Sequence, residues 1–78
     1  MDVLKLQARY KFIRFEERGF SVRGHKAWIC KNNRSNDPLG YVEWNTAWTT
    51  FVLIPEGQTM WSPDCLQDVI HFISRINP

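Results

Sequence analysis

The chain is poor in the residues that bind metals and form disulfides: it has two cysteines and two histidines among 78 residues. Cys30 and Cys65 lie far apart in the sequence and belong to no CxxC pair. His25 and His71 do not complete the spacing of a zinc site, which needs about four ligands. We therefore expect no metal, no disulfide and no cofactor, and two reduced thiols that pack as small apolar residues.

Long apolar runs and the short motifs of catalysis are also lacking. No stretch approaches the roughly 20 apolar residues of a membrane-spanning helix. Residues 1–12 alternate between apolar and polar side chains instead of forming the apolar block of a signal peptide. The sequence contains no GxSxG elbow, no phosphate-binding loop and no HExxH pair. We expect a cytoplasmic protein that does not contact a membrane and is not an enzyme.

Net charge is low, at +2, but the charges are divided unevenly along the chain. Residues 1–34 contain nine Lys or Arg and three Asp or Glu, whereas residues 35–78 contain one Lys or Arg and five Asp or Glu. Such a division predicts a polarised surface that steers a charged partner. The basic residues expected to contact that partner are Lys5, Arg9, Lys11, Arg14, Arg18 and Arg23.

Aromatic residues are abundant for so short a chain, with four Trp, five Phe and two Tyr. Four Trp cannot all fit beneath one helix, so we expect one or two on an open surface, with Trp44 and Trp48 as candidate contact residues. Exposed Trp beside Arg is typical of protein-interaction hot spots. A second small core, or a surface for self-association, is an equally open interpretation.

Apolar and polar residues alternate with a period of two in several segments, which predicts strands with one buried face. Near Phe12 the alternation slips, which predicts a bulge or a bend. Turn-forming residues at 16–19 and at 32–38 predict connections. The predicted strands span residues 4–12, 20–23, 26–31, 39–44 and 48–54.

The last segment has the pattern of an amphipathic helix. Ser62 is a suitable N-cap, and Pro63 suits the first helical position because its missing N–H is not needed there. Apolar residues then recur at helical spacing, which predicts a helix with one buried face. The residues of that expected face are Leu66, Val69, Ile70, Ile73 and Ile76, widened by Cys65 and Phe72. The predicted fold class is α+β: one domain, residues 1–78, in which an antiparallel meander of three to five strands packs on one C-terminal helix.

Residues 26–77 resemble a small domain found in many phage and prophage proteins of unknown function. The shared pattern is LG-x-[VI]-x-W, a second W, F-x-x-x-P, and then S-x-x-CL-x-[DE]-[VI] followed by F[IL] and N. Members often have Arg directly after the second Trp, where this chain has Thr49. The resemblance implies a phage or mobile-element origin, a shared scaffold over residues 26–77 and a variable N-terminal strand region over residues 1–25. The residues that carry it are Trp28 to Cys30, Leu39 to Trp44, Trp48, Phe51 to Pro55, Thr59, Ser62, Cys65 to Val69, Phe72, Ile73 and Asn77.

These observations favour a binding module over an enzyme. The main hypothesis is a phage-encoded protein that occupies the surface of a host protein or nucleoprotein complex in the host cytoplasm, for example as an anti-defence inhibitor. The alternative is a protein that binds single-stranded nucleic acid through a basic strand and exposed aromatics. A homodimer is compatible with either hypothesis.

Overall fold

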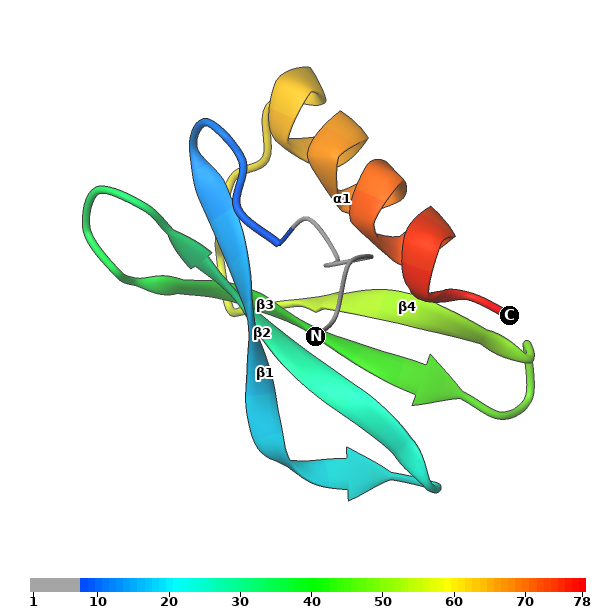
Figure 1. Ribbon diagram of the computed structural model, residues 1–78. Coiled ribbons are helices and arrows are strands. Elements are labelled where there is room, and N and C mark those ends of the chain that lie inside the picture. Colours follow the sequence, from blue (N-terminus) through cyan, green and yellow to red (C-terminus); the bar gives the residue numbers. More distant parts are fainter. Residues whose placement is uncertain (1–7) are drawn as a thin grey trace, which may run out of the picture.

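The computed structural model describes residues 8–78, which form a four-stranded antiparallel sheet and one helix. The elements are β1 (Ile13–Val22), β2 (His25–Asn32), β3 (Pro38–Asn45), β4 (Thr50–Pro55) and α1 (Pro63–Ile76). Each strand pairs with the next one in the chain, so the order across the sheet is β1-β2-β3-β4. The helix lies along one face of the sheet, and no other element of residues 8–78 covers the opposite face (Figure 1). The predicted meander with one C-terminal helix is confirmed.

The core lies between α1 and the face of the sheet toward it. Strand register places Phe15 opposite Cys30 and Cys30 opposite Gly40, so these residues share one face. At the centre, the rings of Phe15 and Phe72 stack with centroids 4.0 Å apart, and Trp28 meets Phe72 edge-on at 5.5 Å. The buried cluster comprises Ile13, Phe15, Trp28, Cys30, Val42, Phe51, Val69 and Phe72.

Helix α1 begins where its sequence predicts. The Ser62 hydroxyl oxygen accepts a hydrogen bond from the Cys65 amide at 3.2 Å, and Pro63 occupies the first turn. At the other end, the Asn77 amide donates to the Ile73 carbonyl at 3.0 Å, and the Asn77 side chain accepts from the Phe51 amide at 2.9 Å. Asn77 therefore ties the end of the helix to the edge strand β4 and satisfies one of that strand's outer donors.

The predicted buried face of the helix is partly wrong. Val69 and Phe72 are buried, and Cys65, Ile73 and Ile76 pack partly buried against the core. Leu66 and Ile70 are exposed, with 43% and 64% of their surface accessible. Phe72 lies at the centre of the contact between helix and sheet, whereas Leu66 and Ile70 lie at its margin. The apolar residues of the helix therefore extend around more of its circumference than the sheet covers.

The N-terminal half differs from its predicted layout. The turn predicted at residues 16–19 is wrong, because β1 runs through it as a strand with a shift of register between Glu17 and Ser21. The predicted strand 20–23 is the end of β1, and the chain turns at Arg23 and Gly24 instead. Strand character in a charged segment is possible here because these side chains lie on exposed parts of the sheet.

The predicted strand 4–12 lies partly outside the described residues, which begin at Ala8. Within residues 8–12, Arg9 forms an isolated bridge with Arg14, and the chain bends at residues 11 and 12, as predicted. Ala8 and Tyr10 pack against the core, whereas Phe12 is 47% exposed at the bend. The last predicted strand starts at Thr50 rather than at residue 48, so Trp48 belongs to the turn before β4.

Candidate binding surfaces

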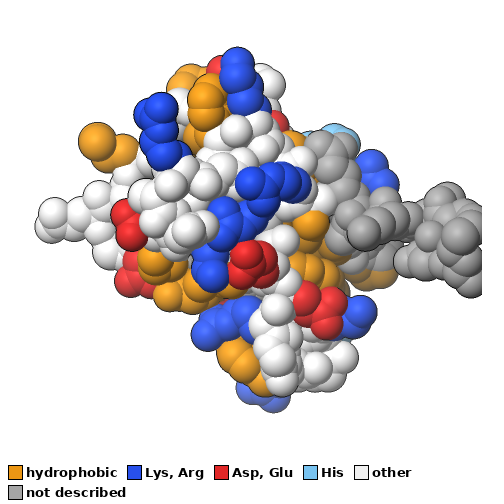
Figure 2. Space-filling view, turned by 60° about the vertical axis from the view of Figure 1, so that its left-hand side comes forward, with side chains coloured by type: hydrophobic (Ala, Val, Ile, Leu, Met, Phe, Trp, Pro, Cys, Tyr) orange, Lys and Arg blue, Asp and Glu red, His pale blue; other side chains and the backbone are white. Residues whose placement is uncertain are grey.

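The face of the sheet opposite α1 is not covered by any element of residues 8–78. One row of residues crosses all four strands on this face, because Glu16 pairs with Ile29, Ile29 with Tyr41 and Tyr41 with Ile54. We call this surface the open sheet face. Figure 2 shows that Lys and Arg side chains are interleaved with Asp and Glu side chains on the side of the molecule that it views, with apolar side chains beside them.

Arg18 is held between two aromatic rings on the open sheet face. Its guanidinium carbon lies 4.4 Å from the centroid of the Phe20 ring and 4.8 Å from that of Tyr41. A guanidinium nitrogen also lies 3.7 Å from a carboxylate oxygen of Glu43. A hydrogen bond to Glu56 raises the pKa of Tyr41 above its ordinary value, with burial as the second cause. The two ring contacts and the ion pair restrain the Arg18 side chain, while Phe20 stays half exposed.

The other basic side chains of β1 and β2 are balanced by carboxylates. Glu16 accepts hydrogen bonds from Arg14 at 2.8 Å and from Lys31 at 2.9 Å. These two bonds, with the bond from Arg14 as the larger cause, hold the pKa of Glu16 below its ordinary value. Lys26 lies 3.5 Å from Glu17. The basic N-terminal half of the sequence therefore folds into a surface of mixed sign, which sequence counting could not reveal.

Arg14 holds the β2–β3 loop in place. Its guanidinium donates to the Asn32 carbonyl and the Asn33 side chain, each at 3.4 Å, and to the Asn36 side chain. Asn36 has a φ of +64°, a left-handed conformation that asparagine tolerates better than most residues. Together with the ion pair to Glu16, these contacts occupy most of the N–H donors of Arg14. Arg14 therefore orders the β2–β3 loop and has few donors left for a partner.

The two predicted contact tryptophans lie in different surroundings. Trp44 is half buried on the helix side, where it stacks on His25 with centroids 4.1 Å apart and meets Phe51 edge-on at 5.2 Å. Trp48 is 71% exposed in the β3–β4 turn, and its amide donates to the Asn45 side chain at 2.9 Å. Thr49 follows with a φ of +51°, an unfavourable value for a β-branched residue. This strained turn presents Trp48 to the solvent.

The remaining predicted contact residues are spread over the molecule. Lys5 lies outside the described residues, and Arg9 is exposed beside the start of β1. Lys11 lies at the bend, with its ammonium 5.2 Å from the centroid of the Phe12 ring. Arg23 lies in the β1–β2 turn, at the opposite end of β1 from Lys11. The structure therefore brings Arg14 and Arg18 to the sheet and separates Lys11 and Arg23.

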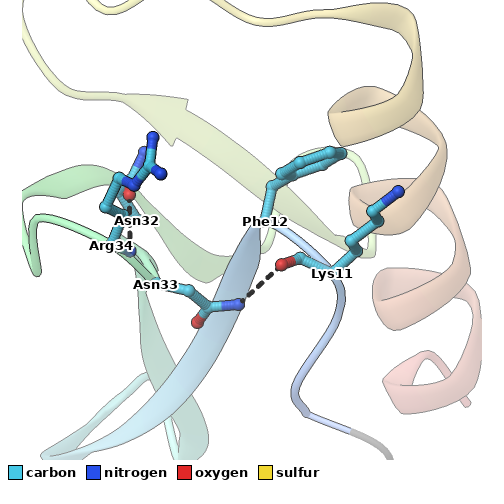
Figure 3. Close-up of a pocket in the computed structure, with 5 residues that line it drawn as sticks. All are labelled: Lys11, Phe12, Asn32, Asn33 and Arg34. Carbon is cyan, nitrogen blue, oxygen red and sulfur yellow. Dashed lines mark hydrogen bonds between the residues drawn. The ribbon is translucent and has the colours of Figure 1, made fainter.

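An open pocket at the end of the sheet was not predicted from the sequence. It lies between the bend at residues 11–12 and the β2–β3 loop, and its volume is about 410 Å³. Figure 3 shows its lining, in which Lys11 and Phe12 come from the bend, Asn32 from the end of β2, and Asn33 and Arg34 from the loop that follows. The only sequence signal was the run of turn-forming residues after β2, which does not reveal what the loop faces. The lining residues are Lys11, Phe12, Asn32, Asn33 and Arg34.

The groups that could do chemistry are few and scattered in the part of the chain that is described. Burial, with the nearby Cys65 as a smaller cause, raises the pKa of the Cys30 thiol to about 12. The Tyr10 hydroxyl and His71 Nδ1 lie 2.7 Å apart and join the N-terminal segment to α1. Within residues 8–78, no three His, Cys, Asp or Glu side chains are grouped so that they could hold a metal ion.

The fold and these surfaces define a small α+β domain with one covered and one open sheet face. No family model, no curated protein and no solved structure matches the chain. Among residues 8–78, no helix has the length and apolar character needed to cross a membrane.

Proposed function

We propose that this chain is a non-catalytic binding module that docks a host-cell protein on its open sheet face. The observation that supports it best is the cluster of Arg18 between Phe20 and Tyr41. Arginine and aromatic residues are enriched at interface hot spots, and side chains already fixed in position lose less entropy when a partner binds. The half-exposed Ile54, on the same row as Tyr41, extends the apolar part of the surface.

The mixed charge of the open sheet face also favours a protein partner over a polyanion. Arg14, Arg18 and Lys31 each face a carboxylate on this surface. A nucleic-acid backbone would have to compete with these carboxylates, whereas a protein can offer both signs of charge in register. The resemblance of residues 26–77 to a phage and prophage domain supports a host protein or nucleoprotein complex as the target, with an anti-defence inhibitor as one form of this role.

The test begins with capture of a partner from host lysate by the purified domain. Binding of the isolated partner is then measured by calorimetry for the wild type, Arg18→Ala and Arg75→Ala. We expect Arg18→Ala to weaken binding about 30-fold, the effect of losing a hot-spot side chain of about 2 kcal/mol. Arg75→Ala removes an exposed cation from the last turn of α1 and should leave binding unchanged. Equal affinity for all three proteins would overturn the assignment of this face.

Binding of single-stranded nucleic acid is the second candidate function. It is favoured by Lys11, Arg23 and Arg34, which are exposed and form no ion pair within residues 8–78. Contacts to phosphates release counterions, so affinity for an oligonucleotide must fall steeply as salt rises. A protein partner held by apolar and paired contacts loses much less affinity over the same range of salt, and a salt titration separates the two functions.

A further inference from the structure

The pocket at the end of the sheet has a rigid base. The Asn33 amide donates to the Phe12 carbonyl at 2.9 Å, and the Asn33 side-chain nitrogen donates to the Tyr10 carbonyl at 2.8 Å. The loop side is closed by Asn32, whose side-chain oxygen accepts from the amides of Arg34 and Ser35 at 2.8 and 3.1 Å. Hydrogen bonds therefore fix the backbone on both sides, and the pocket exists before any ligand arrives.

The side chains above this base remain available to a ligand. Lys11 and Arg34 are exposed, and neither forms an ion pair within the described part of the chain. Phe12 is 47% exposed and contributes an aromatic ring to the same pocket. The Lys11 ammonium lies over one face of this ring, 5.2 Å from its centroid, so the other face is the one left for a ligand. Asn32 uses its side-chain oxygen within the loop, which leaves its side-chain nitrogen to donate to a ligand. The lining has two cations and no carboxylate among the described residues.

These features fit a ligand that is both planar and anionic. An exposed ring offers a stacking surface for a base, and cations beside it attract a phosphate. The volume of about 410 Å³ falls within the range of roughly 300–1,000 Å³ that is usual for small-molecule sites. We propose that this pocket binds a nucleoside phosphate, with the base on the face of Phe12 that Lys11 leaves open, the phosphate at Arg34 and a base acceptor near Asn32.

The ligand has two sources that share this chemistry: a free nucleotide, or one nucleotide of a flexible single strand. The site does not depend on the proposed protein-binding function, since Arg18, Phe20 and Tyr41 are not among the residues that line it. Arg18→Ala should therefore leave nucleotide binding intact, and failure of one proposal would leave the other standing.

The experiment is an NMR titration of the ¹⁵N-labelled chain with uridine monophosphate, uridine, inorganic phosphate and a four-nucleotide oligouridine. We expect saturable shifts at residues 11–12 and 32–34 with uridine monophosphate, and at least about five-fold weaker binding of uridine and of phosphate. Oligouridine that binds about as tightly as the monophosphate indicates a free nucleotide as the ligand, whereas markedly tighter binding indicates a strand.

Variants then test the assigned contacts. Phe12→Ala and Arg34→Ala should each weaken uridine monophosphate about five-fold or more. Arg75→Ala is the matched control for loss of one exposed cation. All three replaced side chains are exposed, and thermal melts verify that the variants fold. Absence of shifts at millimolar uridine monophosphate, phosphate binding as tight as the nucleotide, or unchanged affinity in Phe12→Ala would each overturn the proposal.

Discussion

Gly40 is the position where the addition of a single methyl group should cost the fold most. It is buried in β3, opposite Cys30 on β2 and Pro55 on β4. A Cβ atom built there would lie 2.9 Å from the carbonyl oxygen of Ile54 and 3.1 Å from Leu53 Cδ1, where ordinary contact begins at 3.4 Å. The oxygen belongs to the backbone of the neighbouring strand and cannot rotate away, so β3 and β4 must move apart.

The magnitude of this effect follows from the geometry. Forcing one extra carbon into a closed site typically costs about 1–3 kcal/mol. A domain of this length has a free energy of unfolding of roughly 4–12 kcal/mol. At about 4–8 °C of melting temperature per kcal/mol for such a chain, Gly40→Ala should melt roughly 5–20 °C below the wild type. Urea unfolding followed by tryptophan fluorescence gives the free energy, and circular dichroism gives the melting temperature.

Gly19→Ala is the matched control. No heavy atom lies within 4 Å of a Cβ built at Gly19, and its φ is not in the left-handed region. We expect this variant to be as stable as the wild type or slightly more stable, because alanine restricts the unfolded chain. The steric reasoning would be refuted by a Gly40→Ala protein that unfolds at the wild-type urea concentration, or by equal losses in both variants.

Three further predictions concern the helix and the titrating groups. Val69→Ala should lower the free energy of unfolding by about 1–2.5 kcal/mol, whereas Ile70→Ala should change it by less than about 0.5 kcal/mol, because only Val69 is buried. Equal losses of the two variants in urea unfolding would contradict the placement of the helix. In the native protein a thiol-reactive disulfide reagent should modify the half-buried Cys65 well before Cys30, because the pKa of about 12 keeps the Cys30 thiol protonated. Rapid reaction of both Cys30 and Cys65 would contradict this order. Burial, and secondarily Asp68, raise the pKa of Tyr10, so the contribution of Tyr10 to stability is complete below pH 10 and is lost as the pH rises through the higher folded-state pKa. Tyr10→Phe should therefore flatten the alkaline loss of stability measured by urea unfolding. An unchanged pH profile in this variant would show that Tyr10 is not the cause.

The elements with the strongest local patterns were predictable from the sequence. Ser62 and Pro63 mark the helix start through backbone chemistry that acts within one turn, and alternation around Trp28 and Cys30 assigns β2 and its two faces. The charged run 16–19 was misread as a turn, because exposed strand residues on an open sheet face have the composition of a loop. These residues belong to a strand because β1 pairs with β2, and such pairing cannot be predicted from the sequence of β1 alone.

The candidate sites were less predictable than the fold. Arg18 was identified from its charge, but its position between Phe20 and Tyr41 depends on the register shift in β1 and on the β2–β3 pairing. Arg14 was expected to face a partner, yet three asparagines 18 or more residues away, at the end of β2 and in the loop after it, accept its hydrogen bonds. Pairings between distant polar side chains follow from the assembled sheet, and residue counts carry no information about them.

The meander also has a consequence for how the chain is made. Every strand pairs with its neighbour in sequence, across the short turns 23–24, 33–37 and 46–49, so the sheet can form from local hairpins. Contacts such as Phe15 with Phe72 must wait for α1. At about 5–20 residues per second, synthesis from Pro55 to Ile76 takes roughly 1–4 s. Until α1 docks, the apolar face of the sheet has no cover, because Phe15, Trp28 and Val42 depend on the helix for their burial.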